Sequence, residues 1–153
     1  TSGQLLLSAG ASAHTCTSTV GARTAFSAGV TAPTTASGNF YSDTYTPTLV
    51  DVTNITSTTE AALQYVRIGN VVIVSGVVDV DPAAAGTIEV GIPLPVASAF
   101  TIATDCGGTA GQQNGATDLF IYADATNDRC RLGGVMGSGS DSTTAIMFMY
   151  RIK

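Results

Sequence analysis

The segment LQYVRIGNVVIVSGVVDV, residues 63–80, decides the fold. Its centre is Gly69-Asn70, which lies between two runs rich in Val, Ile and Tyr and favours the positive φ angles of a tight hairpin turn. In the second run, one set of alternate positions is wholly apolar and the other set is mostly apolar. Because side chains alternate between the two faces of a strand, we expect a β-hairpin whose second strand is covered on both faces.

The rest of the chain after this hairpin predicts further short strands and no helix. Candidate strands cover residues 48–56, 87–92, 100–106, 118–123, 129–132 and 144–152. Gly-rich loops are expected at residues 107–115 and 133–142, with a turn at residues 125–128. Short strands at this spacing are typical of an antiparallel sandwich or jelly roll. The sequence therefore predicts an all-β fold, an antiparallel β-sandwich or jelly-roll head over residues 45–153.

The first 44 residues differ in composition from this head. They are rich in Ser, Thr, Ala and Gly and contain few large apolar side chains. Such a segment buries too little apolar surface to offset the entropy of ordering it. We expect residues 1–44 to form an extended N-terminal arm or the end of a shaft, either flexible or ordered by wrapping on neighbours.

Composition and charge exclude several classes of partner. Charged residues make up 11% of the chain, and the net charge is −5. Nucleic acids and anionic membranes both require clustered Lys or Arg, and no apolar run is long enough for a transmembrane helix. We expect neither nucleic-acid binding nor membrane insertion. The low charge and the two-faced strands favour a protein that hides surface in an assembly, the alternative being a secreted β-protein with a Ser/Thr-rich surface.

The last predicted strand repeats the two-faced pattern. Its larger row, Ile146, Phe148, Tyr150 and Ile152, belongs in the core. Its other row predicts a subunit interface, because Met adapts to irregular surfaces. That interface row consists of Ala145, Met147 and Met149. The alternative is that both rows lie inside one wide core.

Catalytic and metal-binding patterns are weak. The single histidine, His14, falls in the N-terminal arm, which is a poor platform for a catalytic triad. Met136 occupies the position where a nucleophile elbow requires Gly, and neither a phosphate loop nor a zinc spacing occurs. We read Asp124, Asn127 and Asp128 as turn formers rather than Ca²⁺ ligands. The sequence predicts a protein that is not an enzyme and binds no metal or cofactor.

Several motifs in residues 45–153 together resemble the C-terminal head domains of tailed-bacteriophage fibre, spike and related virion proteins. The motifs are YTPTL at 45–49, QYVRIGNVVIVSG at 64–76, GIPLP at 91–95, GGTA at 107–110, ADATNDR at 123–129 and FMYRI at 148–152. The resemblance implies a small β-sandwich head, a homotrimer, that is displayed on the virion beside other virion proteins. Assembly would take place in the cytoplasm of the bacterial host.

The function implied by this resemblance is attachment to a glycan or protein of the host surface. Contacts are then expected from residues 107–115, 123–128 and 133–142, because loops held by a rigid scaffold carry binding. The side chains that supply donors and acceptors are Gln112, Gln113, Asn114, Asn127 and Asp128. The alternative is a capsid decoration or cement protein that grips its neighbours through residues 1–44.

Three cysteines complete the sequence, Cys16, Cys106 and Cys130. An odd number excludes a complete disulfide framework. Free thiols are the default in a reducing cytoplasm, but a bond between Cys106 and Cys130 on neighbouring strands stays open at this point.

Overall fold

The structure is a computed structural model that describes residues 40–112, 117–137, 139 and 142–153. Expectations for the segment before residue 40, including His14 and Cys16, lie outside these residues. The strands are β1 (Phe40–Tyr45), β2 (Val50–Thr53), β3 (Ile55–Thr59), β4 (Leu63–Ile68), β5 (Val71–Pro82), β6 (Gly86–Pro93), β7 (Cys106–Gln112), β8 (Thr117–Asp124), β9 (Arg129–Met136) and β10 (Ser142–Arg151). Within the described ranges the only helix is a 3₁₀ turn, η2 (Ala103–Asp105).

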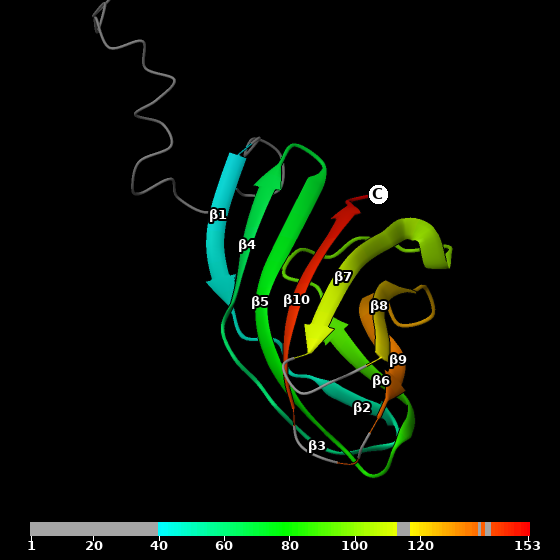
Figure 1. Ribbon diagram of the computed structural model, residues 1–153. Helices are drawn as coiled ribbons and strands as arrows, with labels where there is room; N and C mark the ends of the chain where they lie inside the picture. The colour runs from blue at the N-terminus through cyan, green and yellow to red at the C-terminus, as the bar shows by residue number, and fades with distance from the viewer. Residues whose placement is uncertain (1–39, 113–116, 138, 140–141) are drawn as a thin grey trace, which may run out of the picture. The chain divides into compact units, whose positions relative to one another are not determined.

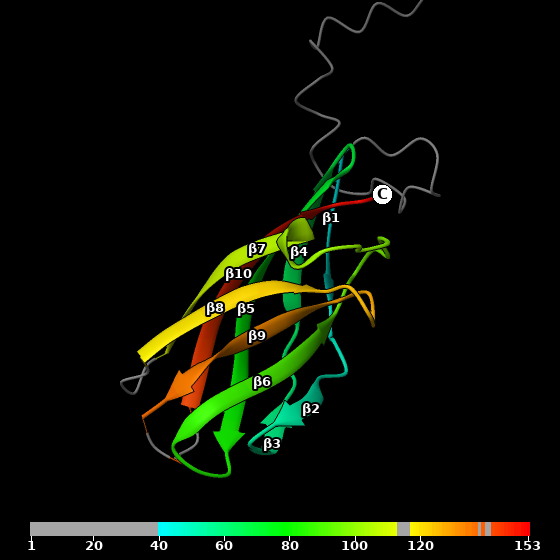
Figure 2. The same ribbon diagram turned by 90° about the vertical axis from the view of Figure 1, so that its right-hand side faces the viewer.

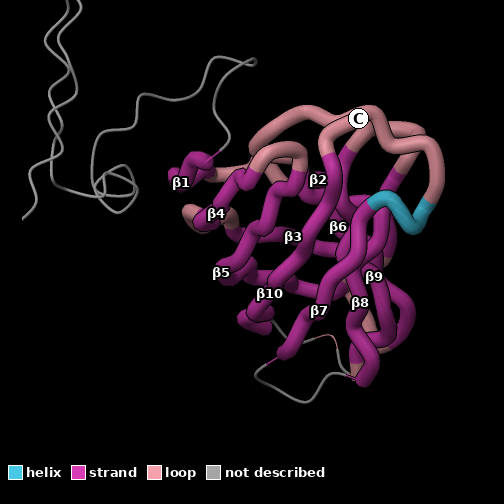
Figure 3. The backbone as a smooth tube through the Cα atoms, turned by 90° about the horizontal axis from the view of Figure 1, so that it is seen from above, coloured by secondary structure: helices cyan, strands magenta, loops and turns pink. Residues whose placement is uncertain are grey.

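All strand pairs are antiparallel and belong to one sheet. The strand order is β1-β4-β5-β10-β7-β8-β9-β6-β2, and β3 pairs with β5. The sheet curls into a half barrel, so that β6 and β2 lie across the core from β5 and β10 (Figures 1, 2 and 3). The prediction of an all-β antiparallel fold with almost no helix is confirmed.

The hairpin that opened the sequence analysis is present at the predicted place. Strands β4 and β5 pair from Ile68↔Val71 to Gln64↔Ser75. Gly69, the first residue of the turn, has φ +58°, a conformation that glycine adopts without steric cost. Beyond Gly76, β5 exchanges β4 for β3 as its neighbour on this edge, while β10 pairs along the other edge. The hairpin therefore supplies the second and third strands of the sheet order.

The core fills the concave side of the curled sheet. The row that was predicted to be wholly apolar in β5 is buried, and so is the larger row of β10. The inward residues of β5 and β10 are Val72, Val74, Val78, Val80, Ile146, Phe148 and Tyr150, and Ile88, Val90, Ile92, Ile121, Cys130 and Leu132 from β6, β8 and β9 face them. One contiguous core thus supports both halves of the sheet.

The convex side of the sheet differs from the expectation of strands covered on both faces. Within the described residues nothing covers the outward side chains of β5 and β10, and Met147 and Met149 are 54% and 55% exposed. No helix of the described chain is long and apolar enough to span a membrane.

Three segments have a different structure from the one their sequences predict. Residues 100–105 form a loop with the η2 turn rather than a strand, and the Gly-rich residues 107–112 are part of β7 rather than a loop. Residues 133–136 likewise continue β9. The reason in β7 is close packing, because a Cβ added at Gly108 would lie 2.2 Å from the backbone oxygen of Met147. Glycine is needed there for space between strands.

Strand β1 places the start of the described chain within the sheet. It pairs with β4 over its whole length, from Phe40↔Ile68 to Tyr45↔Leu63. Residues 40–44, which the sequence analysis assigned to the arm, are therefore strand residues of the head.

Candidate functional site

The outward side of β5, β10, β7 and β8 carries an extended uncharged surface, called here the outer face. Its residues are Ile73, Ser75, Val77, Ala145, Met147, Met149, Gly107, Thr109, Gly111, Phe120 and Tyr122. The register aligns them across strands, so that Ile73 lies opposite Met149, Met149 opposite Gly107, and Gly107 opposite Tyr122. Strand spacing of about 4.8 Å and a rise of about 3.4 Å per residue give the face an area of roughly 350 Å². Apolar patches of this size are often functional.

The predicted interface row lies in the middle of this face. Ala145, Met147 and Met149 are all exposed on β10, and Phe148 between the two Met residues is buried. The structure adds neighbours that the sequence analysis did not single out, namely Ile73 of β5 and Phe120 of β8, the latter 51% exposed. The alternation in β8, where Ile121 and Ala123 are buried while Phe120 faces outward, is the signal that could have found this side chain.

The outer face contains a groove whose floor is β7. Gly107 and Gly111 point outward, and a Cβ added at either would meet no atom within 4 Å. Met147 and Met149 on β10 form one wall, and Phe120 and Tyr122 on β8 form the other. A hollow of about 280 Å³ lies along the Met wall, bounded by Ile73, Gly107, Gly108, Thr109, Met147, Phe148 and Met149.

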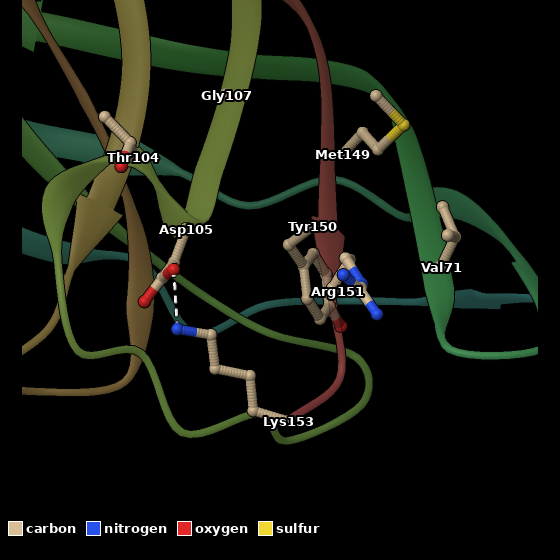
Figure 4. A pocket seen from close by; sticks show the side chains of 8 residues that line it. All are labelled: Val71, Thr104, Asp105, Gly107, Met149, Tyr150, Arg151 and Lys153. Carbon is tan, nitrogen blue, oxygen red and sulfur yellow. Dashed lines mark ion pairs between the residues drawn. The ribbon is translucent and has the colours of Figure 1, made fainter.

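A second, more polar pocket continues the groove toward the C-terminus. It has a volume of about 620 Å³ and is lined by Val71, Thr104, Asp105, Gly107, Met149, Tyr150, Arg151 and Lys153. Figure 4 shows the Lys153 side chain reaching toward Asp105, and the two charged atoms are 2.6 Å apart. The hydrogen bond from Lys153 and those from the backbone of Thr101 and Ile102 hold the pKa of Asp105 well below its usual range. The Asp105 carboxylate in this pocket therefore already has an ion-pair partner and hydrogen-bond donors within its own chain.

Among the predicted ligand-binding residues, Asn127 and Asp128 lie in the turn between β8 and β9. The carboxylate of Asp128 accepts hydrogen bonds from the backbone of Ser98 at 3.2 Å and of Phe100 at 2.9 Å. The Asn127 amide donates to Asp124 at 2.8 Å. Asn127 thus makes the short-range contact expected of a turn former. Asp128 instead holds the backbone of the distant loop at Ser98 and Phe100, which the turn-former interpretation did not predict.

Asp124, in the same turn, is the centre of a charged cluster. Its Oδ2 atom accepts from Asn127, from Arg129 at 2.9 Å and from Arg131 at 3.1 Å, and Arg131 also pairs with Glu89. Burial alone would raise the pKa of Asp124, but the hydrogen bonds from Asn127 and Arg129 and the two guanidinium charges outweigh it and lower that pKa. Asp124 and Glu89 are therefore both paired with arginine side chains of the same chain.

Gln112 lies at the opposite end of β7 from that turn. It pairs with Thr144, whereas Gly107, near the other end of β7, pairs with Tyr122, close to Asp124. The Gln112 amide donates to the Sδ atom of Met136 at 3.2 Å. Gln113 and Asn114 lie outside the described residues. The structure therefore does not bring Gln112 together with Asn127 and Asp128.

The two cysteines of the head are free and buried. Cys106 is in β7 and Cys130 is in β9, and β8 lies between these strands. Within the described ranges, no group of three His, Cys, Asp or Glu side chains could hold a metal ion.

Comparisons with known proteins give no relative for this arrangement. Neither a protein-family model, nor a curated protein sequence, nor a solved structure matches the chain.

Proposed function

We propose that the chain is a non-enzymatic virion protein of a tailed bacteriophage, the homotrimeric head of a fibre or spike that attaches to the host surface. The motif order in residues 45–153 suggests the class. The observation that carries the proposal is the outer face, on which Met147 and Met149 remain more than half exposed. A surface of this kind favours burial against a partner. As part of the same proposal, the two halves of the curled sheet correspond to the layers of a β-sandwich or jelly roll.

The topology also supports different roles for the two ends of the sheet, connection to the virion at one end and host contact at the other. Phe40 pairs with Ile68 and Arg151 pairs with Val71, so both ends of the described chain lie beside the Gly69 turn. Gln112 pairs with Thr144 near the opposite end of the strands. Figure 1 shows this arrangement, with the start of β1 and the C-terminus at one end and the end of β7 at the other. If the N-terminal segment connects the head to the rest of the virion, the end of the sheet that carries Gln112 faces away from the virion.

The experiment is adsorption of the purified protein to a panel of bacterial strains, with competition against the phage that infects them. We expect the combined substitution Gln112→Ala, Gln113→Ala and Asn114→Ala to weaken adsorption and to leave the oligomer intact. Asn70→Ala, in the exposed turn beside Gly69 at the other end of the sheet, is the control and should adsorb like the wild type. Equal weakening by both variants would contradict the assignment of the Gln112 end.

The alternative function, a capsid decoration or cement protein, gives a different result in the same assay. Such a protein would not adsorb to cells and would bind assembled capsids through residues 1–44. Binding to capsids that disappears when residues 1–39 are removed would replace the attachment proposal.

A further inference from the structure

The outer face carries a ridge and a groove side by side. The ridge consists of Met147 and Met149 on β10 with Ile73 beside them on β5. The groove follows the next strand, where Gly107 and Gly111 leave the floor without side chains. Its walls stand on the strands flanking β7, which are about 10 Å apart at a strand spacing of about 4.8 Å. That width accommodates one row of side chains.

The glycines of the groove floor are not required by the fold of the single chain. Neither Gly107 nor Gly111 has a positive φ angle. An added Cβ at either position would meet nothing within 4 Å, and glycine weakens a strand relative to residues with side chains. Gly108, in contrast, is required because its inward face touches Met147 and Phe148. The open floor is therefore a feature of the surface.

The charges around the face favour an uncharged partner surface. From Ile73 across β10 and β7 to Phe120, the outer face has no charged residue. Among the charged side chains at its borders, Arg131 pairs with Glu89 and Lys153 pairs with Asp105. Arg151 at the end of the ridge is exposed to solvent, and Asp79 follows Val77 on the same side of β5. Among the groove residues, only Thr109 and Tyr122 carry a side-chain hydrogen-bonding group for a polar small molecule.

We propose that the β7 groove of one protomer receives the Met147–Met149 ridge of a second copy of this chain. A chain of net charge −5 is repelled by copies of itself, and an uncharged face is where two copies meet at least electrostatic cost. Ridge and groove run along the strands side by side, so a rotation about an axis along the strands brings the ridge of each copy to the groove of the next. Such a contact is heterologous, and it closes into a ring of three copies when the rotation from one copy to the next is a third of a turn.

This inference rests on the proposed homotrimer and names the surfaces that build it. It adds Phe120 as the far wall of the contact and assigns Gly107 and Gly111 to assembly. Met residues suit the role because they adjust to the shape of a partner.

The test is the double substitution Gly107→Val and Gly111→Val, which fills the groove and leaves the ridge unchanged. Mass is measured by light scattering at micromolar concentration, with circular dichroism as the check on folding. The wild type should have three times the 15.4 kDa of one chain, and the double variant should have the mass of a single chain with an unchanged spectrum. Ala97→Val, which adds apolar bulk in an exposed loop outside the groove, should keep the wild-type mass.

A second variant decides the question if the double variant does not fold. Phe120→Asp places a charge on the groove wall at a position that is half exposed in the single chain, so it should fold and remain a monomer. A wild-type monomer, or a full-size Phe120→Asp oligomer, would overturn the inference. A third outcome is that Met147→Asp fails to assemble while the folded Gly107→Val, Gly111→Val variant assembles normally. That result would refute the role of the groove but would still support a homotrimer formed through the ridge.

Discussion

Gly107 and Gly108 are adjacent in the chain but serve opposite faces of β7. At Gly108 an added Cβ would lie 2.2 Å from the Met147 backbone oxygen and 2.7 Å from the Cβ of Phe148. At Gly107 the same atom would point into open space. The alternation of a strand thus gives two neighbouring glycines different reasons to be present.

Gly108→Ala should therefore destabilise the head, and Gly107→Ala should not. Overpacking of this kind costs about 1–3 kcal/mol, and more where the obstructing atom is backbone. Urea unfolding followed by circular dichroism measures the difference as a shift of the midpoint. Equal midpoints for the two variants would show that β7 does not approach β10 as closely as described.

Asp124 is expected to make the stability of the fold sensitive to acid. Its pKa in the folded state is lowered, chiefly because the hydrogen bonds from Asn127 and Arg129 outweigh burial. A carboxyl whose folded pKa is depressed stabilises the fold above its unfolded pKa, near 4, and loses that contribution as the pH falls through the folded pKa. Asp124→Asn should therefore unfold at a lower temperature than the wild type at pH 7. This difference should shrink as the pH falls below about 4, toward the depressed folded pKa; a constant difference would contradict the assignment.

At the scale of elements, the sequence predicted best where local pattern and tertiary environment agree. The hairpin of β4 and β5 and the inward row of β10 follow directly from the turn at Gly69 and from alternation. Residues 107–112 were misread because the residue types that mark a loop also permit close strand contact, and only the packing on Phe148 distinguishes the two. The spread of the predicted ligand residues to opposite ends of the sheet depends on strand order, which no local pattern encodes.

The positions of Cys106 and Cys130 follow from the same strand order. Because β8 lies between their strands, the two residues are not on neighbouring strands, and both thiols are free in the structure. Burial and the neighbouring Cys106 thiol raise the pKa of the Cys130 thiol, which disfavours the reactive thiolate.

We therefore expect both thiols of the head to stay reduced and to resist alkylation while the protein is folded. Mass spectrometry after iodoacetamide treatment, with and without denaturant and in the absence of reductant, measures this. Both cysteines should be modified only after unfolding. An unmodifiable pair in denaturant that becomes reactive on reduction would reveal a disulfide instead.

At the scale of the whole molecule, the proposed assembly through the uncharged outer face predicts a specific response to salt. Charged pairs between subunits weaken as ionic strength rises, because the screening length falls from about 8 Å at 0.15 M to about 3 Å at 1 M. A contact made by Met147, Met149 and Phe120 has no such charges to screen, and screening reduces the repulsion between copies of net charge −5. The proposed oligomer should therefore keep its mass between 0.15 M and 1 M NaCl, while sulfate should strengthen it, as it strengthens apolar burial. Sedimentation at both salt concentrations measures the dissociation constant. Dissociation at 1 M NaCl would show that ion pairs hold the copies together, and Arg151 at the border of the face would then be the first residue to replace.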